Sequence, residues 1–293
     1  MHENDSPPAP RPPRRRGLTL TVAALVPAAL AGWLVWGVTS GPAKSVPHGA
    51  RPAPGPSAPS PAAPGPSPAA PLAGRTVVID PGHNPGNFRH AREIGRQVDI
   101  GTNRKECDTT GTSTDSGHTE AAFTLDVSHR LRTLLQEQGA TVTLTHDADR
   151  PFGPCVDERA RIGNAAEADA VVSVHADGSA AGNRGFHVIL PALVKGGGAD
   201  TARIVAPSRD LGRAVARQFA AATGSAPANY IGDGTGLDVR KDLGGLNLST
   251  VPKVFVECGN MRDPKDAALL TDAAWRQKAA RGIAAGIATY LRD

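Results

Sequence analysis

Four residues of this chain have the types and settings that hydrolytic chemistry requires: His83, Glu120, His175 and Glu257. Each lies at the edge of an apolar segment, where a charge or an imidazole contributes little to folding. His83 is the most informative, because it follows the apolar run 77–79 through a Pro-Gly corner that removes side-chain bulk. A histidine presented in this way can reach a metal ion. Together the four residues predict a zinc hydrolase.

Glu120 is predicted to place a negative charge on the buried face of a helix. It precedes Phe123 by three positions and Val127 by seven, so on a helix the three side chains share one face. An unpaired carboxylate on an inward face is costly, so an arginine, a set of hydrogen bonds or a cation must compensate it. Interaction with the helix dipole alone is the alternative explanation for a glutamate at a helix start.

The two histidines follow apolar segments whose carboxyl ends form the ligand crevice in open α/β sheets. Two imidazoles and one carboxylate are a common ligand set for catalytic zinc, with the fourth position left to water or substrate. His118 is close enough to Glu120 to compete for the metal or to lie beside its ligands. The remaining histidines of this part are expected to be core or surface residues: His90, His129, His146 and His187.

Glu257 ends the apolar run 253–256, so its carboxylate should face the same crevice. There it could act as the general base, taking a proton from water and returning it to a departing amine. A purely structural ion pair with Arg159 or Arg240 is the alternative role for this carboxylate.

Short β-branched runs alternate with longer helical patterns, which predicts an α/β fold. We expect a single domain with a central, mostly parallel or mixed sheet flanked by helices, over residues 75–293. Thr119 suits the amino-cap of the first long helix and Gly139 its end. The expected strands are Thr76–Asp80, Thr141–His146, Ala170–His175, Phe186–Leu190 and Lys253–Glu257. The expected helices are Glu120–Gln138, Val156–Glu167, Arg209–Ala222 and Ala273–Leu291.

Residues 84–118 have no sustained period and are expected to form a loop or irregular hairpin near the site. Cys107 and Cys155 both lie in polar, turn-rich segments, whereas Cys258 follows an apolar run. We therefore expect a disulfide between Cys107 and Cys155, with Cys258 free and buried.

The amino-terminal part has the composition of a targeting and membrane-anchoring segment. Residues 1–16 form a basic tail, expected in the cytoplasm, and 17–43 are uncharged and long enough for a transmembrane signal-anchor. Residues 44–74 are rich in Pro, Ala and Ser and are expected to be a disordered linker. We therefore expect a single-pass protein of the cell membrane with an extracytoplasmic domain, or alternatively secretion to the cell wall.

The basic character of the chain comes only from this part. The first 74 residues hold six basic and two acidic residues, and the remainder holds 26 of each. Nucleic acid is therefore not an expected partner.

Four ordered segments resemble the zinc-dependent N-acetylmuramoyl-L-alanine amidases of the periplasmic and cell-wall type: 78–83, the glutamate at 120, 172–176 and 252–261. The resemblance spans nearly all of 75–293. It implies one Zn²⁺ bound by His83, Glu120 and His175, with Glu257 catalytic. It also implies cleavage of the amide between muramic acid and the first L-alanine of the peptidoglycan stem, in a protein expected to be monomeric.

The sequence departs from the usual family pattern after the first histidine, at 84–87, and after the catalytic glutamate, at 258–261. These differences leave the implied ligands in place but bear on the substrate. Asn84, Arg240 and Asn247 are candidate substrate-binding residues, although ordinary loop structure explains them equally well. We expect no helical insertion that plugs the active site.

Two other functions fit parts of the pattern. A zinc carboxypeptidase would offer similar chemistry, but it normally takes two ligands from a His-x-x-Glu segment, and position 86 is glycine. A noncatalytic wall-binding module could retain the fold, yet all four candidate site residues are present.

Overall fold

The computed structural model describes residues 70–292. The expected basic tail, the membrane anchor and most of the linker lie outside the described residues and stay predictions. Within residues 70–292, no helix combines the length and the apolar character needed to cross a membrane. Leu72, from the end of the expected linker, is fully buried, and its amide donates to the carbonyl of Gln138 at 2.8 Å. Packed structure therefore begins before residue 75.

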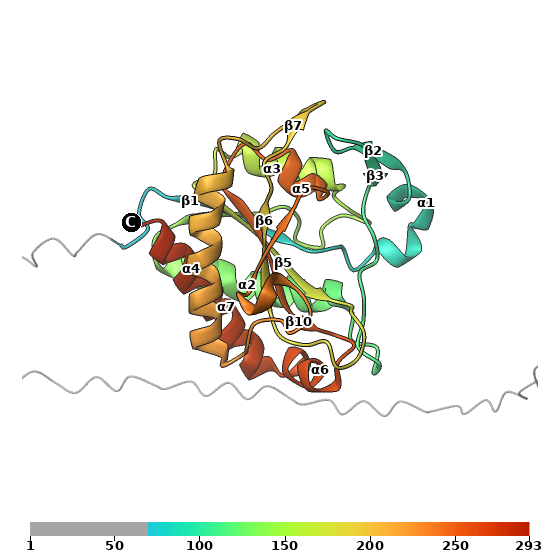
Figure 1. Ribbon diagram of the computed structural model, residues 1–293, viewed down its shortest axis with the longest axis vertical. Coiled ribbons are helices and arrows are strands. Elements are labelled where there is room, and N and C mark those ends of the chain that lie inside the picture. Colours follow the sequence, from blue (N-terminus) through green and yellow to red (C-terminus); the bar gives the residue numbers. More distant parts are fainter. Residues whose placement is uncertain (1–69, 293) are drawn as a thin grey trace, which may run out of the picture. The chain divides into compact units, whose positions relative to one another are not determined.

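The centre of the domain is a six-stranded mixed sheet (Figure 1) with the spatial order β4-β1-β5-β10-β6-β9. The neighbours from β4 to β10 are parallel, β10 and β6 are antiparallel, and β6 and β9 are parallel. This confirms the expected mostly parallel sheet. The strands are β1 (Thr76–Pro81), β4 (Thr141–Leu144), β5 (Ala170–Asp177), β6 (His187–Pro191), β9 (Leu237–Arg240) and β10 (Lys253–Asn260).

Alternation along the strands separates an apolar face from a face that carries polar groups. On β10, Val254 and Val256 enter the main core, whereas Lys253, Phe255 and Glu257 lie on the other face. The same alternation on β1 and β5 places apolar residues toward the main core. The polar face is therefore where chemistry can be assembled.

Three long helices cover the apolar face of the sheet: α2 (Glu120–Glu137), α4 (Val205–Thr223) and α7 (Ala273–Tyr290). Figure 1 shows α4 beside α7, with the shorter α6 (Pro264–Thr271) nearby. The opposite face packs against α3 (Val156–Ala165) and the single turn α5 (Gly244–Asn247). As expected, Thr119 caps α2 and Gly139 follows its end with a φ of 90°.

The observed elements differ from the expected ones mainly at their ends. α4 begins at Val205 instead of Arg209, because Pro207 falls in the first turn, where its missing N–H has no intrahelical partner to lose. β6 begins at His187 instead of Phe186, and β4 ends before His146. The sequence pattern also missed β9, α6 and the small hairpin of β7 (Lys195–Gly196) with β8 (Ala199–Asp200). The hairpin that was one of the two expectations for 84–118 is present as β2 (Gln97–Asp99) with β3 (Arg104–Glu106).

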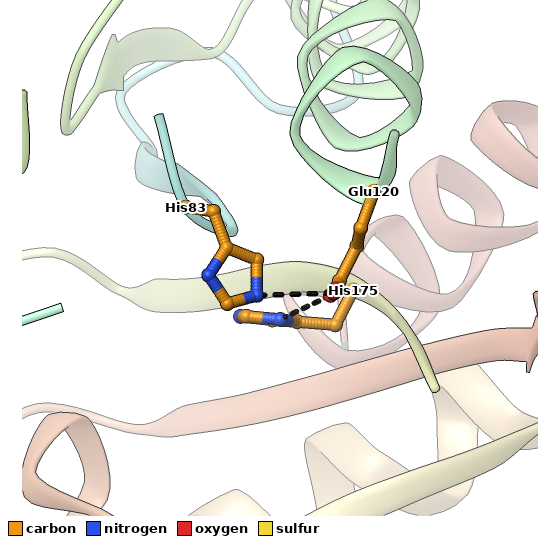
Figure 2. Close-up of side chains that lie close together, drawn as sticks. All are labelled: His83, Glu120 and His175. Carbon is orange, nitrogen blue, oxygen red and sulfur yellow. Dashed lines mark hydrogen bonds and ion pairs between the residues drawn. The ribbon is translucent and has the colours of Figure 1, made fainter. Parts of the chain in front are cut away.

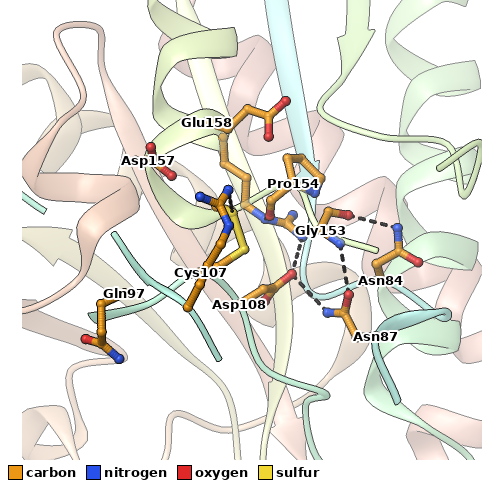
Figure 3. The surroundings of a disulfide bond; sticks show 12 residues. Asn84, Asn87, Gln97, Cys107, Asp108, Gly153, Pro154, Asp157 and Glu158 are labelled. Carbon is orange, nitrogen blue, oxygen red and sulfur yellow. Dashed lines mark hydrogen bonds and ion pairs between the residues drawn. A yellow bond between two sulfur atoms is a disulfide. The ribbon is translucent and has the colours of Figure 1, made fainter. Parts of the chain in front are cut away.

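The segment 84–118 is irregular, as expected. It contains the turn η1 (Asn87–Arg89), the short helix α1 (Ala91–Ile94) and the β2–β3 hairpin. A disulfide joins Cys107 to Cys155 at the entrance of α3 (Figure 3), whereas Cys258 is free and buried. The bridge fixes the segment next to the polar face of the sheet.

Candidate active site

Three side chains converge at the carboxyl edge of the parallel strands (Figure 2). His83 follows β1 with a φ of 61°, a backbone region that non-glycine residues rarely adopt. Glu120 is the first residue of α2, and His175 lies near the end of β5. Three separate elements thus bring together the residues that the sequence predicts as ligands.

The distances within this triad suit a single ion. Nε2 of His83 lies 3.1 Å from Oε2 of Glu120, and Nδ1 of His175 lies 2.9 Å from Oε1 of the same carboxylate. One donor atom from each residue lies within 4.8 Å of the other two. Two imidazoles and a carboxylate are also the donor types that zinc prefers. The residues present therefore fit a zinc ion.

His83 is oriented by groups on its far side. Its Nδ1 lies 3.1 Å from the carbonyl oxygen of Thr109 and 3.5 Å from Oδ1 of Asp108. Burial by itself would lower the pKa of His83, but the carboxylates of Glu120 and Asp108 raise it to about 10. The acceptors hold a proton on Nδ1, which turns Nε2 toward Glu120. A metal ion at this position would take the place of the proton on Nε2.

The imidazole of His175 lies against the backbone of Gly82 and stacks on Phe255, with ring centroids 5.2 Å apart. A Cβ at position 82 would lie 2.6 Å from Nδ1 of His175, well inside van der Waals contact. The close approach of this ring therefore requires glycine at position 82.

Glu257 lies next to the triad. In the parallel ladder it pairs with His175, so the two side chains are neighbours on one face of the sheet. Its Oε2 is inaccessible and has no hydrogen-bond partner within the described residues. Burial raises the pKa of Glu257 well above its usual range, and the carboxylates of Glu120 and Asp177 raise it further. Such an unpartnered carboxylate is suited to exchange protons with a bound molecule.

The structural alternative for Glu257 is not observed. Arg159 pairs with Asp80 at 2.8 Å and with Asp108 at 3.0 Å. Arg240 pairs with Asp242 at 2.7 Å. Both candidate arginines therefore have other carboxylate partners.

Comparison with known proteins agrees with this geometry. Residues 77–289 match the model of a family described as Amidase_3, N-acetylmuramoyl-L-alanine amidase. The chain belongs to this family.

The amidase is 43% identical over 226 residues to N-acetylmuramoyl-L-alanine amidase Rv3717 of Mycobacterium tuberculosis, covering 75% of this chain and 88% of the relative. It is also similar to the crystal structure of the amidase Ami1 of Mycobacterium smegmatis, with 42% identity and a TM-score of 0.69. That match covers 75% of this chain and 98% of the other. Ami1 of Mycobacterium abscessus in its apo form gives 41% identity, a TM-score of 0.69 and coverages of 75% and 100%.

Beneath the triad, the amidase has a buried network of alternating charges. Asp80 accepts hydrogen bonds from Arg159 at 2.8 Å and from the fully buried Lys253 at 3.0 Å. Arg159 also donates to Asp108 at 3.0 Å and to the carbonyl of His83 at 3.0 Å. Burial alone would raise the pKa of Asp80, but the two cations hold it far below its usual value. The network links the buried face of the sheet to the backbone of His83.

These supporting residues were not assigned from the sequence. Lys253 begins a run that the sequence predicts as a strand, which suggests no further role, and the only role that the sequence suggests for Arg159 is an ion pair with Glu257. The available signal was the period-two spacing that puts Lys253, Phe255 and Glu257 on one face of a strand.

The candidate substrate-binding residues of the amidase occupy different environments. Asn84 is buried and donates to the carbonyl of Gly153 at 2.8 Å (Figure 3). Its Oδ1 accepts from the amide of Gly86 at 2.8 Å. Asn247 is buried and donates to the carbonyl of Lys241 at 3.0 Å. Arg240 is partly exposed. The metal-ligand cluster contains His83, Glu120 and His175, and His118 is not part of it.

A cavity of about 500 Å³ lies beside His83 and His175. It opens between the β2–β3 hairpin and the loop before α5, and offers apolar walls with a few polar groups. Its lining includes Gln97, Lys105, Glu106, Val156, Leu243 and Phe255. The cavity offers room for a ligand next to the triad.

Proposed function

We propose that the protein is a zinc-dependent N-acetylmuramoyl-L-alanine amidase, which hydrolyses the amide between the lactyl group of N-acetylmuramic acid and L-alanine of the stem peptide. The observation that carries the proposal is the placement of an unpartnered glutamate, Glu257, beside a triad whose donor atoms lie within 4.8 Å of one another. Membership of the amidase family supports the choice of substrate.

Each residue of the site has a separate role in the proposed reaction. A zinc ion held by His83, Glu120 and His175 would supply Lewis-acid polarisation of the carbonyl and would lower the pKa of water. Glu257 accepts the proton of the attacking water, since its Oε2 has no hydrogen-bond partner among residues 70–292. It then returns this proton to the nitrogen of the departing L-alanine. The buried charges that contact the backbone of His83 keep its ring in place during these steps.

Replacing Glu257 tests the proposal directly. The Glu257→Gln variant of the full-length protein should keep about one zinc per chain but release no stem peptide from muropeptides, because an amide does not accept the proton. Metal analysis and mass spectrometry of digested peptidoglycan measure the two properties. Glu137→Gln, at the exposed end of α2, is the matched control and should remain fully active.

The products also separate the proposed amidase from the other candidate functions. An amidase yields intact stem peptides and peptide-free glycan, a carboxypeptidase yields shortened stems, and a binding module yields no products. A fully active Glu257→Gln variant would contradict the assigned base.

A further inference from the structure

We propose that Phe88 is a sugar-contacting residue of this site, and that the cavity it lines holds the N-acetylmuramoyl part of the substrate. The inference rests on the proposed function and extends it to the glycan side of the scissile amide. It is carried by a cavity next to the triad, an exposed aromatic ring in the wall of that cavity, and the place of Glu257 on the other side of the triad.

The cavity lies next to the triad and is separate from the one beside His83 and His175. Its volume is about 320 Å³, within the roughly 300–1,000 Å³ that ligand pockets occupy. Its lining includes Asn84, which follows His83, and Thr119, which precedes Glu120. Gly111 also lines it, and a Cβ there would lie 2.7 Å from Oε2 of Glu120 and 2.7 Å from Cδ2 of His83. The backbone at Gly111 therefore lies against the triad, and a ligand in the cavity would be adjacent to the proposed metal site.

The walls of this cavity favour an uncharged, hydroxyl-rich ligand. Four of its lining side chains carry hydroxyl groups: Thr110, Thr112, Ser113 and Thr119. A hydroxyl both donates and accepts hydrogen bonds, as the hydroxyl and acetamido groups of a sugar require. None of the residues within 70–292 that line this cavity is charged, whereas the cavity beside the two histidines is lined in part by Lys105, Glu106 and Asp242. The smaller cavity therefore suits the sugar better than a stem peptide, which carries carboxylates.

Phe88 adds an aromatic surface to these walls. Its side chain is 65% exposed, and no other phenylalanine, tyrosine or tryptophan within residues 70–292 is classed as exposed. The guanidinium of Arg89 lies 4.9 Å from the centroid of the ring and helps to orient it. The face of an aromatic ring carries partial negative charge, which attracts the C–H groups on the face of a sugar ring. A sugar that packs on Phe88 would also remove its apolar surface from water.

The turn that carries Phe88 is held firmly from below (Figure 3). The preceding residue, Asn87, is fully buried. Its Nδ2 donates to Oδ2 of Asp108 at 3.0 Å and to the carbonyl of Thr109 at 2.7 Å, and its Oδ1 accepts from the amide of Gly153 at 2.9 Å. Phe88 is therefore presented by a fixed turn, so a ligand does not have to order this segment when it binds.

The direction of the substrate agrees with this assignment. Glu257, on β10, returns its proton to the leaving nitrogen, so this nitrogen lies on the β10 side of the triad. β1, which leads into His83, lies on the opposite side of β5. The acyl part of the substrate, which is the lactyl group with its sugar, therefore extends past His83. The cavity that Phe88 lines begins at the residue after His83 and lies beside the start of α2.

Binding of the two reaction products to the full-length protein tests the assignment. Phe88→Ala should weaken binding of the disaccharide N-acetylglucosaminyl-N-acetylmuramic acid by about tenfold, because a stacked aromatic contact contributes roughly this much. Binding of the stem fragment L-alanyl-D-isoglutamine should not change. Isothermal titration calorimetry measures both affinities. Leu193→Ala, which removes an apolar side chain that is 71% exposed, is the matched control and should bind both products like the parent.

Conservative variants and kinetics separate stacking from a structural role. Phe88→Tyr, which keeps the ring, should bind the disaccharide like the parent, whereas Phe88→Leu, which is apolar without a ring, should bind it as weakly as Phe88→Ala. In hydrolysis of muropeptides, Phe88→Ala should raise KM by about tenfold and leave kcat unchanged, since a contact made equally before and during the reaction affects only binding.

Three results would overturn the role of Phe88: unchanged disaccharide affinity in Phe88→Ala, equal weakening for both products, or parent-like affinity in Phe88→Leu. A parent protein that does not bind the disaccharide would overturn it as well. Inactivity of the parent protein on muropeptides would instead overturn the proposed function, since binding of the disaccharide is measured without turnover.

Discussion

At the scale of single residues, the triad depends on groups that never contact the metal position. Asp108 accepts from Arg159 and from Asn87, each at 3.0 Å, and faces Nδ1 of His83. These hydrogen bonds occupy the oxygen atoms of the Asp108 carboxylate and restrict its movement. Asp108 is therefore a positioning residue for His83.

Removing the charge of Asp108 should weaken zinc binding. We expect Asp108→Asn to lower the zinc affinity by about 10- to 100-fold, because groups that orient metal ligands typically contribute this much. Competition with a chromogenic chelator measures the affinity. Asp115→Asn, whose side chain is 80% exposed, should bind zinc like the parent. Equal affinities of the Asp108 variant and the parent would show that Thr109 alone orients the ring.

At the scale of elements, the site combines regular and irregular structure. Glu120 could be located from sequence because its helix has a clear period, a capping threonine and a terminal glycine. The loop that carries Asp108 has no period, and it is held by the disulfide between Cys107 and Cys155 together with backbone hydrogen bonds. These links join segments far apart in the sequence, so no local pattern predicts them.

Loss of the disulfide should destabilise the domain. The bridge spans 48 residues, so Cys107→Ser with Cys155→Ser should lower the free energy of unfolding by about 4 kcal/mol through the entropy of the unfolded chain. Urea unfolding measures this difference. A reducing agent should destabilise the parent protein but leave the double variant unchanged. A double variant within about 1 kcal/mol of the parent would contradict a stabilising role.

At the scale of the whole molecule, the sequence identified the sheet, the long helices and the triad, because each leaves a local pattern of apolar spacing. It did not identify the network of Asp80, Arg159 and Lys253, whose members are up to 173 positions apart and meet only when the sheet is assembled.

Metal removal should change the stability of the whole domain. A ligand that binds only the native state stabilises it by about 2.7 kcal/mol at 100 times its dissociation constant. Chelation of zinc should therefore lower the melting temperature by about 5–10 °C for a domain of this size. Scanning calorimetry before and after adding zinc back checks this. The His83→Ala variant should not respond to the chelator, and a parent protein that does not respond either would contradict the metal site.

The contact between Gly82 and His175 has a consequence for reading other members of the family. The second histidine occupies the volume that any larger residue at the preceding corner would fill. A related protein with a larger residue at this corner would have to place that imidazole elsewhere. The residue type at this one position therefore indicates whether a related structure can hold its second histidine as close to the first as this one does.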